Sequence, residues 1–211
     1  AVGQLPIHVG TQNIDMLSLS AHKFHGPKGT GALYVKKGVP LQRLIHGGAQ
    51  ERGKRAGTEN IPAIVGMAAA LEESCNRMAE TTAHVTELRN RLIDGLSEIP
   101  HSRLNGTLSP RLPNNVNFSF EGIEGESLIL LLDRMGICAS TGSACNSGSI
   151  APSHVLLALG HPPELAHGSL RLTLCGENTE TEIDYLISTV RTAVAELRRK
   201  SENRALLHFM K

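Results

Sequence analysis

The sequence predicts an α/β fold, and three observations lead to this prediction. Two apolar segments near the start, 14–19 and 29–35, have the length and composition of short paired strands, the first of them buried. Amphipathic helical patterns follow from Ile61. Beyond Pro100, strand and helix patterns alternate, which is typical of an α+β domain. We therefore expect part of a sheet domain followed by a smaller α+β domain.

The first domain, residues 1–80, is expected to contain the two strands, a long loop and a helix. The loop covers residues 47–60 and is rich in glycine and charge, and long ordered loops are usually functional. The helix is expected to begin at Ile61, with Pro62 in its first turn. The polar stretch 79–84 interrupts the helical pattern, which indicates the boundary to a second domain, residues 81–211.

The second domain is expected to alternate strands and helices. Strands are predicted over residues 116–120, 137–140 and 169–174. Helices are predicted over residues 126–135, which Gly136 ends, and over 152–160. A last helix is expected to begin at Thr179, which with Glu182 forms a capping box.

Composition argues against several classes of function. The 21 basic residues nearly balance the 20 acidic ones, which gives no support for nucleic-acid or anionic-membrane binding. There is no tryptophan and aromatics are scarce, so base-stacking platforms are not expected. No apolar run approaches the roughly 20 residues of a membrane span, and no signal peptide is expected. The four cysteines lack a Cys-x-x-Cys spacing, which argues against a zinc site and fits a reducing, cytoplasmic compartment.

Lys23 is the first candidate for a chemical role. It follows the strand 14–19 in the segment Ser20-Ala21-His22-Lys23 and precedes a Gly-Pro turn. A lysine amine forms a Schiff base with an aldehyde cofactor, and desolvation leaves part of the amine neutral and nucleophilic. Ser20 and His22 flank it and are suited to hold a phosphate group. The alternative for Lys23 is an ordinary surface lysine, and the alternative for His22 is a core histidine with satisfied hydrogen bonds.

Cys145 is the second candidate. It stands in Ser143-Ala144-Cys145-Asn146-Ser147-Gly148, a loop of small polar residues. Cysteine is usually among the most buried residues, so a cysteine in such surroundings is expected to be exposed and available for nucleophilic work. The alternative is a loop with an incidental free thiol.

Together, in this order, these segments resemble the cysteine desulfurases of the NifS/IscS family. The resemblance covers essentially the whole chain, and its further motifs are Gly47-Gly48-Ala49-Gln50-Glu51-Arg52, Arg55-Ala56-Gly57-Thr58-Glu59-Asn60, Glu124-Gly125-Glu126-Ser127, Pro152-Ser153-His154-Val155-Leu156 and Leu170-Arg171-Leu172-Thr173-Leu174. The Ala-Gly-Thr-Glu-Asn form resembles the NifS branch, which is tied to nitrogenase assembly and nitrogen fixation. The resemblance implies the pyridoxal-phosphate-dependent transferase fold type I. Residues 1–80 would be the C-terminal part of the cofactor-binding large domain, and residues 81–211 the small domain.

The resemblance also implies a reaction. Lys23 would hold pyridoxal 5'-phosphate, with Ser20 and His22 at its phosphate. Cys145 would take sulfur from L-cysteine, leaving L-alanine and a protein-bound persulfide. An iron-sulfur scaffold protein would accept that sulfur, and Cys145 would be a candidate ligand to the iron of a shared cluster.

Three further residues receive roles from the resemblance. Thr58 would reach the phosphate of the neighbouring subunit, so a homodimer would form the site; a helix N-cap is the alternative role for this residue. Arg171 would bind the substrate carboxylate through two hydrogen bonds, the alternative being a surface salt bridge. Asn117 would also approach the substrate.

Two alternatives to desulfuration remain open on the sequence. Selenocysteine lyase activity uses the same chemistry, and cysteine and selenocysteine differ only subtly in how they fit the pocket. The second is a non-catalytic dimerising or scaffold-docking fragment, because the chain resembles the C-terminal half of the family enzymes and the residues that hold the cofactor ring lie in the other half. The chain also departs from many family members at Cys175, where we expect a small core filler without a catalytic role.

Overall fold

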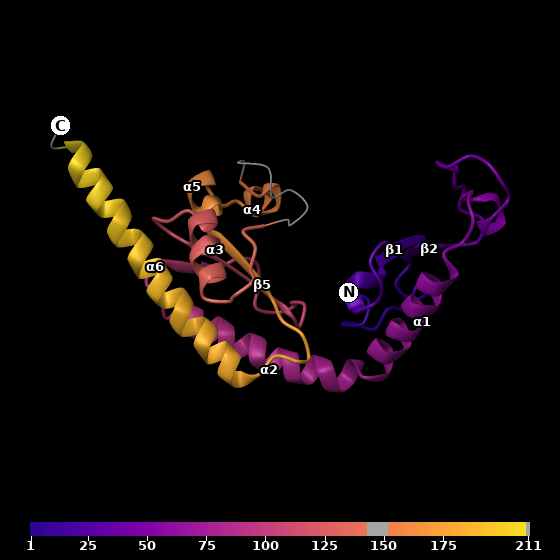
Figure 1. Ribbon diagram of the computed structural model, residues 1–211, viewed down its shortest axis with the longest axis horizontal. Coiled ribbons are helices and arrows are strands. Elements are labelled where there is room, and N and C mark those ends of the chain that lie inside the picture. The colour runs from indigo at the N-terminus through magenta and orange to yellow at the C-terminus, as the bar shows by residue number, and fades with distance from the viewer. Residues whose placement is uncertain (143–151, 210–211) are drawn as a thin grey trace. The chain divides into compact units, whose positions relative to one another are not determined.

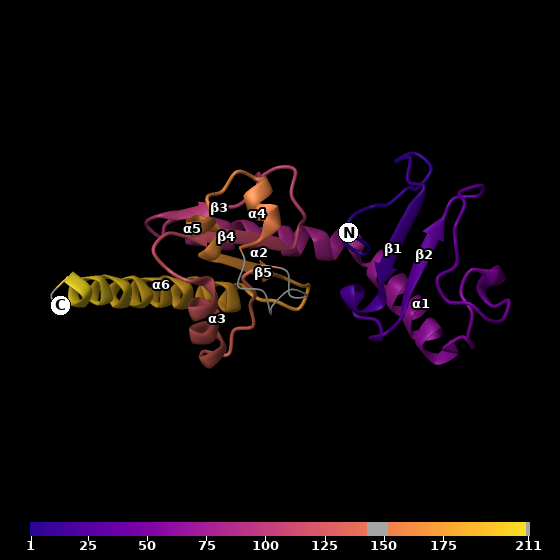
Figure 2. The same ribbon diagram turned by 90° about the horizontal axis from the view of Figure 1, so that it is seen from above.

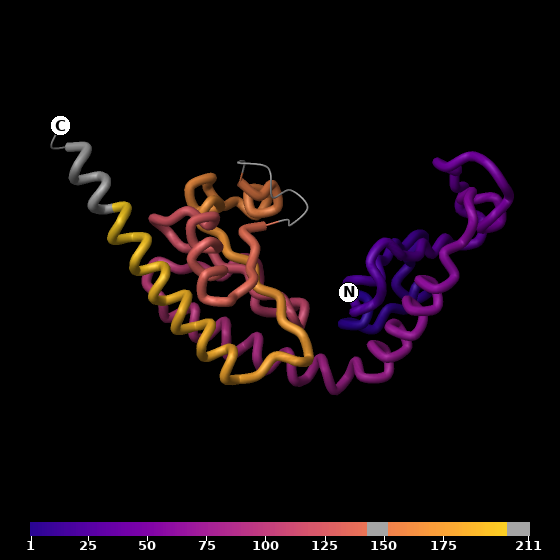
Figure 3. Tube along the Cα trace, viewed as in Figure 1, coloured from indigo at the N-terminus to yellow at the C-terminus, as the bar shows by residue number. Residues whose placement is uncertain are grey.

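The computed structural model describes residues 1–142 and 152–209, the last eight of these by their backbone only (Figures 1 and 3). The chain divides into two units, Ala1–Glu80 and Thr81–Lys211. Within the described ranges, no helix has the length and apolar character needed to cross a membrane. The structure has the mixed helix and sheet composition that the sequence predicts.

The first unit contains a two-stranded antiparallel sheet. Strand β1 (Met16–Ser20) pairs with β2 (Gly31–Val35) along their whole lengths, so that Ser20 lies opposite Gly31 (Figure 2). A 3-10 helix, η1 (Ala21–Phe24), follows β1 directly. A second 3-10 turn, η2 (Glu51–Gly53), lies in the long loop before α1 (Ile61–Asn76), and α1 packs against η1.

The expected burial of the first strand is wrong. Residues of β1 alternate between exposed and half-buried, and Met16 is 43% exposed. Leu33 on β2 is 48% exposed. The described helices explain this result, because α1 packs mainly on η1 and leaves the apolar side chains of the sheet without a covering layer.

Helix α2 (Met78–Ser97) runs through the polar stretch 79–84, where the helical pattern was expected to be interrupted. The break lies slightly earlier, at Arg77, which caps the end of α1 with its backbone amide. Alanine, glutamate and threonine are tolerated in an exposed helix, so a polar stretch alone does not stop one.

The second unit is built on a three-stranded antiparallel sheet in the order β3-β4-β5. Its strands are β3 (Ser102–Leu104), β4 (Asn115–Phe120) and β5 (Ser169–Thr173). Helices α2, α3 (Gly125–Arg134) and α6 (Glu180–Phe209) contribute to one core with the apolar face of this sheet. The largest fully buried side chains are Phe118, Phe120, Leu88, Leu92, Leu96, Leu128, Leu132, Leu170 and Ile183.

The two faces of this sheet differ in chemistry. Val116 and Phe118 of β4 and Leu170 and Leu172 of β5 point into the core. Because side chains alternate along a strand, the intervening residues of both strands lie on the opposite face. Those residues are polar: Asn115, Asn117, Ser119, Ser169, Arg171 and Thr173.

Several predicted elements of this unit agree with the structure and others do not. Helix α6 begins with the expected capping box, in which the Thr179 and Glu182 amides each bond to the other side chain. The strand predicted over residues 137–140 is reduced to one bridge between Ser140 and Arg171. The helix expected over residues 152–160 is shorter, α4 (His154–Ala158), and α5 (Pro163–His167) was not predicted.

Candidate functional site

Lys23 is presented to solvent by the turn η1, whose first and last residues are buried. Ala21 and Phe24 are 0% and 3% exposed, and between them His22 and Lys23 are exposed. Backbone bonds hold the turn, because Ala21 donates to the Thr30 carbonyl and accepts from Gly26. Because Ala21 and Phe24 are buried on either side of it, the turn holds Lys23 in a defined position at the end of β1.

Three groups around this turn are free to bind a ligand. The Ser20 hydroxyl makes no capping bond to η1, and within the described ranges no hydrogen bond or ion pair engages the His22 ring or the Lys23 amine. Together they supply one amine and two hydrogen-bond donors within four residues. This donor set fits an aldehyde that carries a phosphate group, which is the chemistry of pyridoxal phosphate.

Thr58 does not cap α1. The N-cap is Asn60, whose side chain accepts a bond from the Ala63 amide at 3.3 Å, so the alternative role for Thr58 is wrong. The neighbouring Gly57 amide donates to Gln50 Oε1 at 3.2 Å. The exposed Thr58 hydroxyl forms no hydrogen bond among the described residues and remains the candidate donor to the phosphate.

Arg171 and Asn117 are brought together by the sheet of the second unit. They are directly opposite each other in the β4–β5 register, so their side chains lie on the same polar face as neighbours. Both are half-buried. No carboxylate of the described residues forms an ion pair with the Arg171 guanidinium, so the predicted salt-bridge alternative finds no support there.

The residues that directly precede the Cys145 segment, residues 143–151, are bonded to the strand that carries Arg171. Ser140 and Arg171 exchange both backbone hydrogen bonds, and the Thr141 carbonyl accepts from the Ser169 hydroxyl. Gly142 lies close to Ser153, because a Cβ on Gly142 would be 3.8 Å from the Ser153 Cβ. Residues 143–151, and with them Cys145, lie outside the described residues.

A polar cluster beside Asn117 was not predicted from the sequence. Asn105, which follows β3, is 4% exposed and donates through its side-chain amide to Asn117 Oδ1 at 2.6 Å and to Ser119 Oγ at 2.9 Å. The only local signal is the Asn105-Gly106 dipeptide, which predicts a turn. Nothing in that dipeptide indicates a bond to a residue twelve positions away.

The other cysteines have the surroundings of ordinary thiols. Cys75 and Cys138 are exposed, and the expected strand around Cys138 does not form. Cys175 is only half-buried, so it is a partial core filler, and its backbone amide is bonded to Asn178 Oδ1 at 2.9 Å. No cluster of three or more potential metal ligands occurs within residues 1–142 and 152–209.

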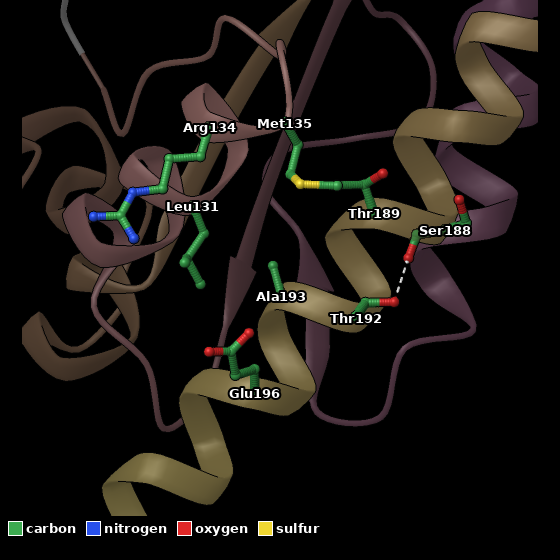
Figure 4. Close-up of a pocket in the computed structure, with 8 residues that line it drawn as sticks. All are labelled: Leu131, Arg134, Met135, Ser188, Thr189, Thr192, Ala193 and Glu196. Atoms are coloured by element: carbon green, nitrogen blue, oxygen red, sulfur yellow. Dashed lines mark hydrogen bonds between the residues drawn. The ribbon is translucent and has the colours of Figure 1, made fainter.

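A pocket of about 270 Å³ lies elsewhere in the second unit, between α3 and α6 (Figure 4). Leu131 and Arg134 of α3, with Met135 at its end, face residues of α6 across it. The residues from α6 are Ser188, Thr189, Thr192, Ala193 and Glu196. None of the predicted site residues lines this pocket.

Comparison with known proteins shows the family of the chain. Residues 1–186 match the aminotransferase class-V family model. The chain therefore belongs to the class-V aminotransferase family, and it has the fold of that family.

Three individual relatives show more specifically which proteins this chain is similar to. The cysteine desulfurase IscS of Clostridium botulinum is 56% identical over 204 residues, which cover 95% of this chain and 51% of that protein. A solved NifS-like protein is 40% identical with a TM-score of 0.83, over 93% of this chain and 50% of its own. The structure described as SspA in complex with cysteine is 35% identical with a TM-score of 0.61, over 85% of this chain and 49% of its own. The chain spans about half the length of the relatives it matches.

Proposed function

We propose that this chain carries the lysine, cysteine and arginine of a pyridoxal-phosphate-dependent cysteine desulfurase. The observation that carries the proposal is that each unit holds its own group of side chains suited to this chemistry. One group is the exposed amine of Lys23 with its phosphate donors, and the other is the guanidinium of Arg171, which lies opposite Asn117 and forms no ion pair within the described ranges. The likeness to proteins named cysteine desulfurase supports the same reaction.

The cofactor, when bound, supplies an electron sink for the carbanion at the substrate Cα. Ser20 and His22 bind its phosphate, and Thr58 does so from the neighbouring subunit of a homodimer. Lys23 holds the cofactor and then moves the proton at Cα. Arg171 and Asn117 bind the carboxylate of L-cysteine and so orient the substrate.

Cys145 completes the reaction as the nucleophile. Its thiolate attacks the substrate sulfur, the bond from that sulfur to the substrate Cβ breaks, and the substrate retains the bonding electrons and takes up a proton at Cβ as it becomes alanine. The sulfur stays on Cys145 as a persulfide. We propose that a cytoplasmic iron-sulfur scaffold protein accepts this sulfur and combines it with the iron of its cluster.

The test uses the full-length protein that carries this chain. Incubated with L-cysteine, it should release L-alanine, and mass spectrometry after one turnover should find about 32 Da, one added sulfur atom, on the peptide with Cys145. Cys145→Ala should bind L-cysteine and release no sulfur. Sulfur on Cys138 or Cys175, with an active Cys145→Ala variant, would contradict the assignment of the nucleophile.

A further inference from the structure

Asn117 has its carboxamide held in one orientation by a buried neighbour. Its Oδ1 accepts from Asn105 Nδ2 at 2.6 Å, so the Asn117 oxygen faces Asn105 and its own NH2 group faces away from it. No hydrogen bond within the described ranges engages that NH2 group. Asn117 therefore presents two N–H donors on the polar face, opposite Arg171 in the register.

Asn105 is itself fixed at every polar group. Its backbone amide donates to the Asn117 carbonyl at 2.8 Å, and its own carbonyl accepts from Arg111 Nη2. Its side-chain amide donates to Asn117 and to Ser119 Oγ, and the Ser119 hydroxyl lies 3.3 Å from Asn105 Oδ1. A side chain that is 4% exposed and fully bonded has little freedom to flip.

The loop that follows Asn105 is held by two arginines. Arg111 donates to the carbonyls of Thr107 and Asn115, at the two ends of the β3–β4 connection. Arg89 of α2 donates to the Leu112 carbonyl at 3.0 Å. These bonds fix the loop against the sheet and so fix the position of Asn105.

We propose that Asn105 is a positioning residue that sets the Asn117 amide as a donor for the substrate carboxylate beside Arg171. The inference rests on the proposed function, because it takes that carboxylate to be bound by Arg171. A guanidinium and an amide N–H together present only donors, which suits a carboxylate and disfavours a neutral or cationic group at the same position. If the amide were reversed, Asn117 would present an oxygen and repel the carboxylate.

The experiment compares Asn105→Asp with the wild type in the full-length protein. An ionised aspartate has no donor for Asn117 Oδ1, so the amide loses its fixed orientation. Hydrogen bonds to charged groups change affinity by about tenfold or more, so we expect KM for L-cysteine to rise about tenfold with a smaller change in kcat. The dissociation constant of L-alanine, which keeps the carboxylate and lacks sulfur, should rise by a similar factor.

Three comparisons separate positioning from a merely structural role. Ser119→Ala removes another partner of Asn105 in the same cluster and should leave KM within about twofold. In an Asn117→Ala background, the effect of Asn105→Asp on KM should disappear. Lowering the pH should diminish the rise in KM, because a protonated carboxyl can donate to Asn117 again.

The opposite results would overturn the inference. These are an unchanged KM in an active Asn105→Asp variant, an equal rise in Ser119→Ala, or a rise that persists without the Asn117 side chain. Asn105→Ala, which adds no charge, replaces the aspartate variant if that variant does not fold. A wild type that releases no alanine from cysteine refutes the proposed function instead, and the L-alanine dissociation constants still test Asn105.

Discussion

Replacing Gly125 by alanine adds one methyl group, which should disturb both the fold and Thr141, a residue shortly before the Cys145 segment. Gly125 is the first residue of α3 and is buried. A Cβ built there would lie 2.5 Å from the Ser169 carbonyl oxygen, 2.7 Å from Thr141 Cγ2 and 3.0 Å from the His167 carbonyl oxygen. Two of the three obstacles are backbone atoms, which cannot rotate away, so the strand or the helix must shift.

The expected cost follows from the number of close contacts. Overpacking by one methyl group costs about 1–3 kcal/mol, and displacing the Ser169 hydroxyl from the Thr141 carbonyl adds about 1 kcal/mol. Alanine regains about 0.4–1 kcal/mol relative to glycine through the unfolded chain. The net loss of unfolding free energy for Gly125→Ala is thus about 1–3.6 kcal/mol, which lowers the melting temperature by roughly 2–14 °C for a chain of this size.

Urea and thermal denaturation followed by far-UV circular dichroism measure this difference. Gly142→Ala is the matched control in the same unit, because among the described residues its Cβ would meet Ser153 alone, at 3.8 Å, an ordinary contact. That variant should be neutral or slightly more stable than the wild type. A Gly125→Ala protein that melts at or above the Gly142→Ala temperature would refute the reasoning about backbone contacts.

Three further changes test other parts of the molecule. Lys23→Ala should abolish turnover and the borohydride-reducible link between protein and cofactor, and a link on another lysine would contradict its role. Arg171→Lys should raise KM for cysteine about tenfold, because an ammonium cannot form the paired bonds of a guanidinium, and an unchanged KM would rule out carboxylate binding there. Burial, and secondarily Arg103, lowers the pKa of the His161 ring, so the unfolded chain takes up that proton first and stability should fall as pH drops below about 6.5. His161→Gln should lessen the fall in the urea midpoint between neutral and acid pH, and an equal fall in both proteins would show that His161 does not cause it.

Strands β4 and β5 of the second unit were predictable because one face of their sheet is buried. Val116, Phe118 and Phe120 alternate with polar residues, and so do Leu170 and Leu172. The capping box of α6 was predictable for a similar reason, since both partners lie within one turn. In each case the physical cause acts over a few residues, and the pattern is visible in the chain.

The elements that sequence reasoning missed are short or depend on distant contacts. Strand β3 has three residues and pairs with β4 across the long loop that Arg111 holds. The segment 137–140 has strand-like composition, yet only Ser140 reaches a partner. Asn60 displaces Thr58 as the cap of α1 because it stands directly before the helix.

The same distinction between local patterns and distant contacts applies to the candidate site residues. A lysine after an apolar run is a local pattern, so the sequence itself marks Lys23 as a candidate, whereas Arg171 received its expected role only from the resemblance to the family. Asn105 is a buried asparagine in a turn, and only the fold brings it to Asn117. Buried polar networks that join distant segments leave no periodic signal, so such residues need a structure to be recognised.

The register of β4 against β5 links the core of the second unit to its candidate chemistry. A shift by one residue would turn Leu170 or Leu172 onto the polar face and bury Arg171 without a partner, which would cost both apolar burial and charge solvation. The buried pair Phe118 and Phe120, with ring centroids 6.1 Å apart, opposes such a shift from one face. The bond from the Asn105 amide to the Asn117 carbonyl opposes it from the neighbouring strand. The same contacts that fold the unit therefore hold Arg171 and Asn117 opposite each other, where we propose that a carboxylate binds.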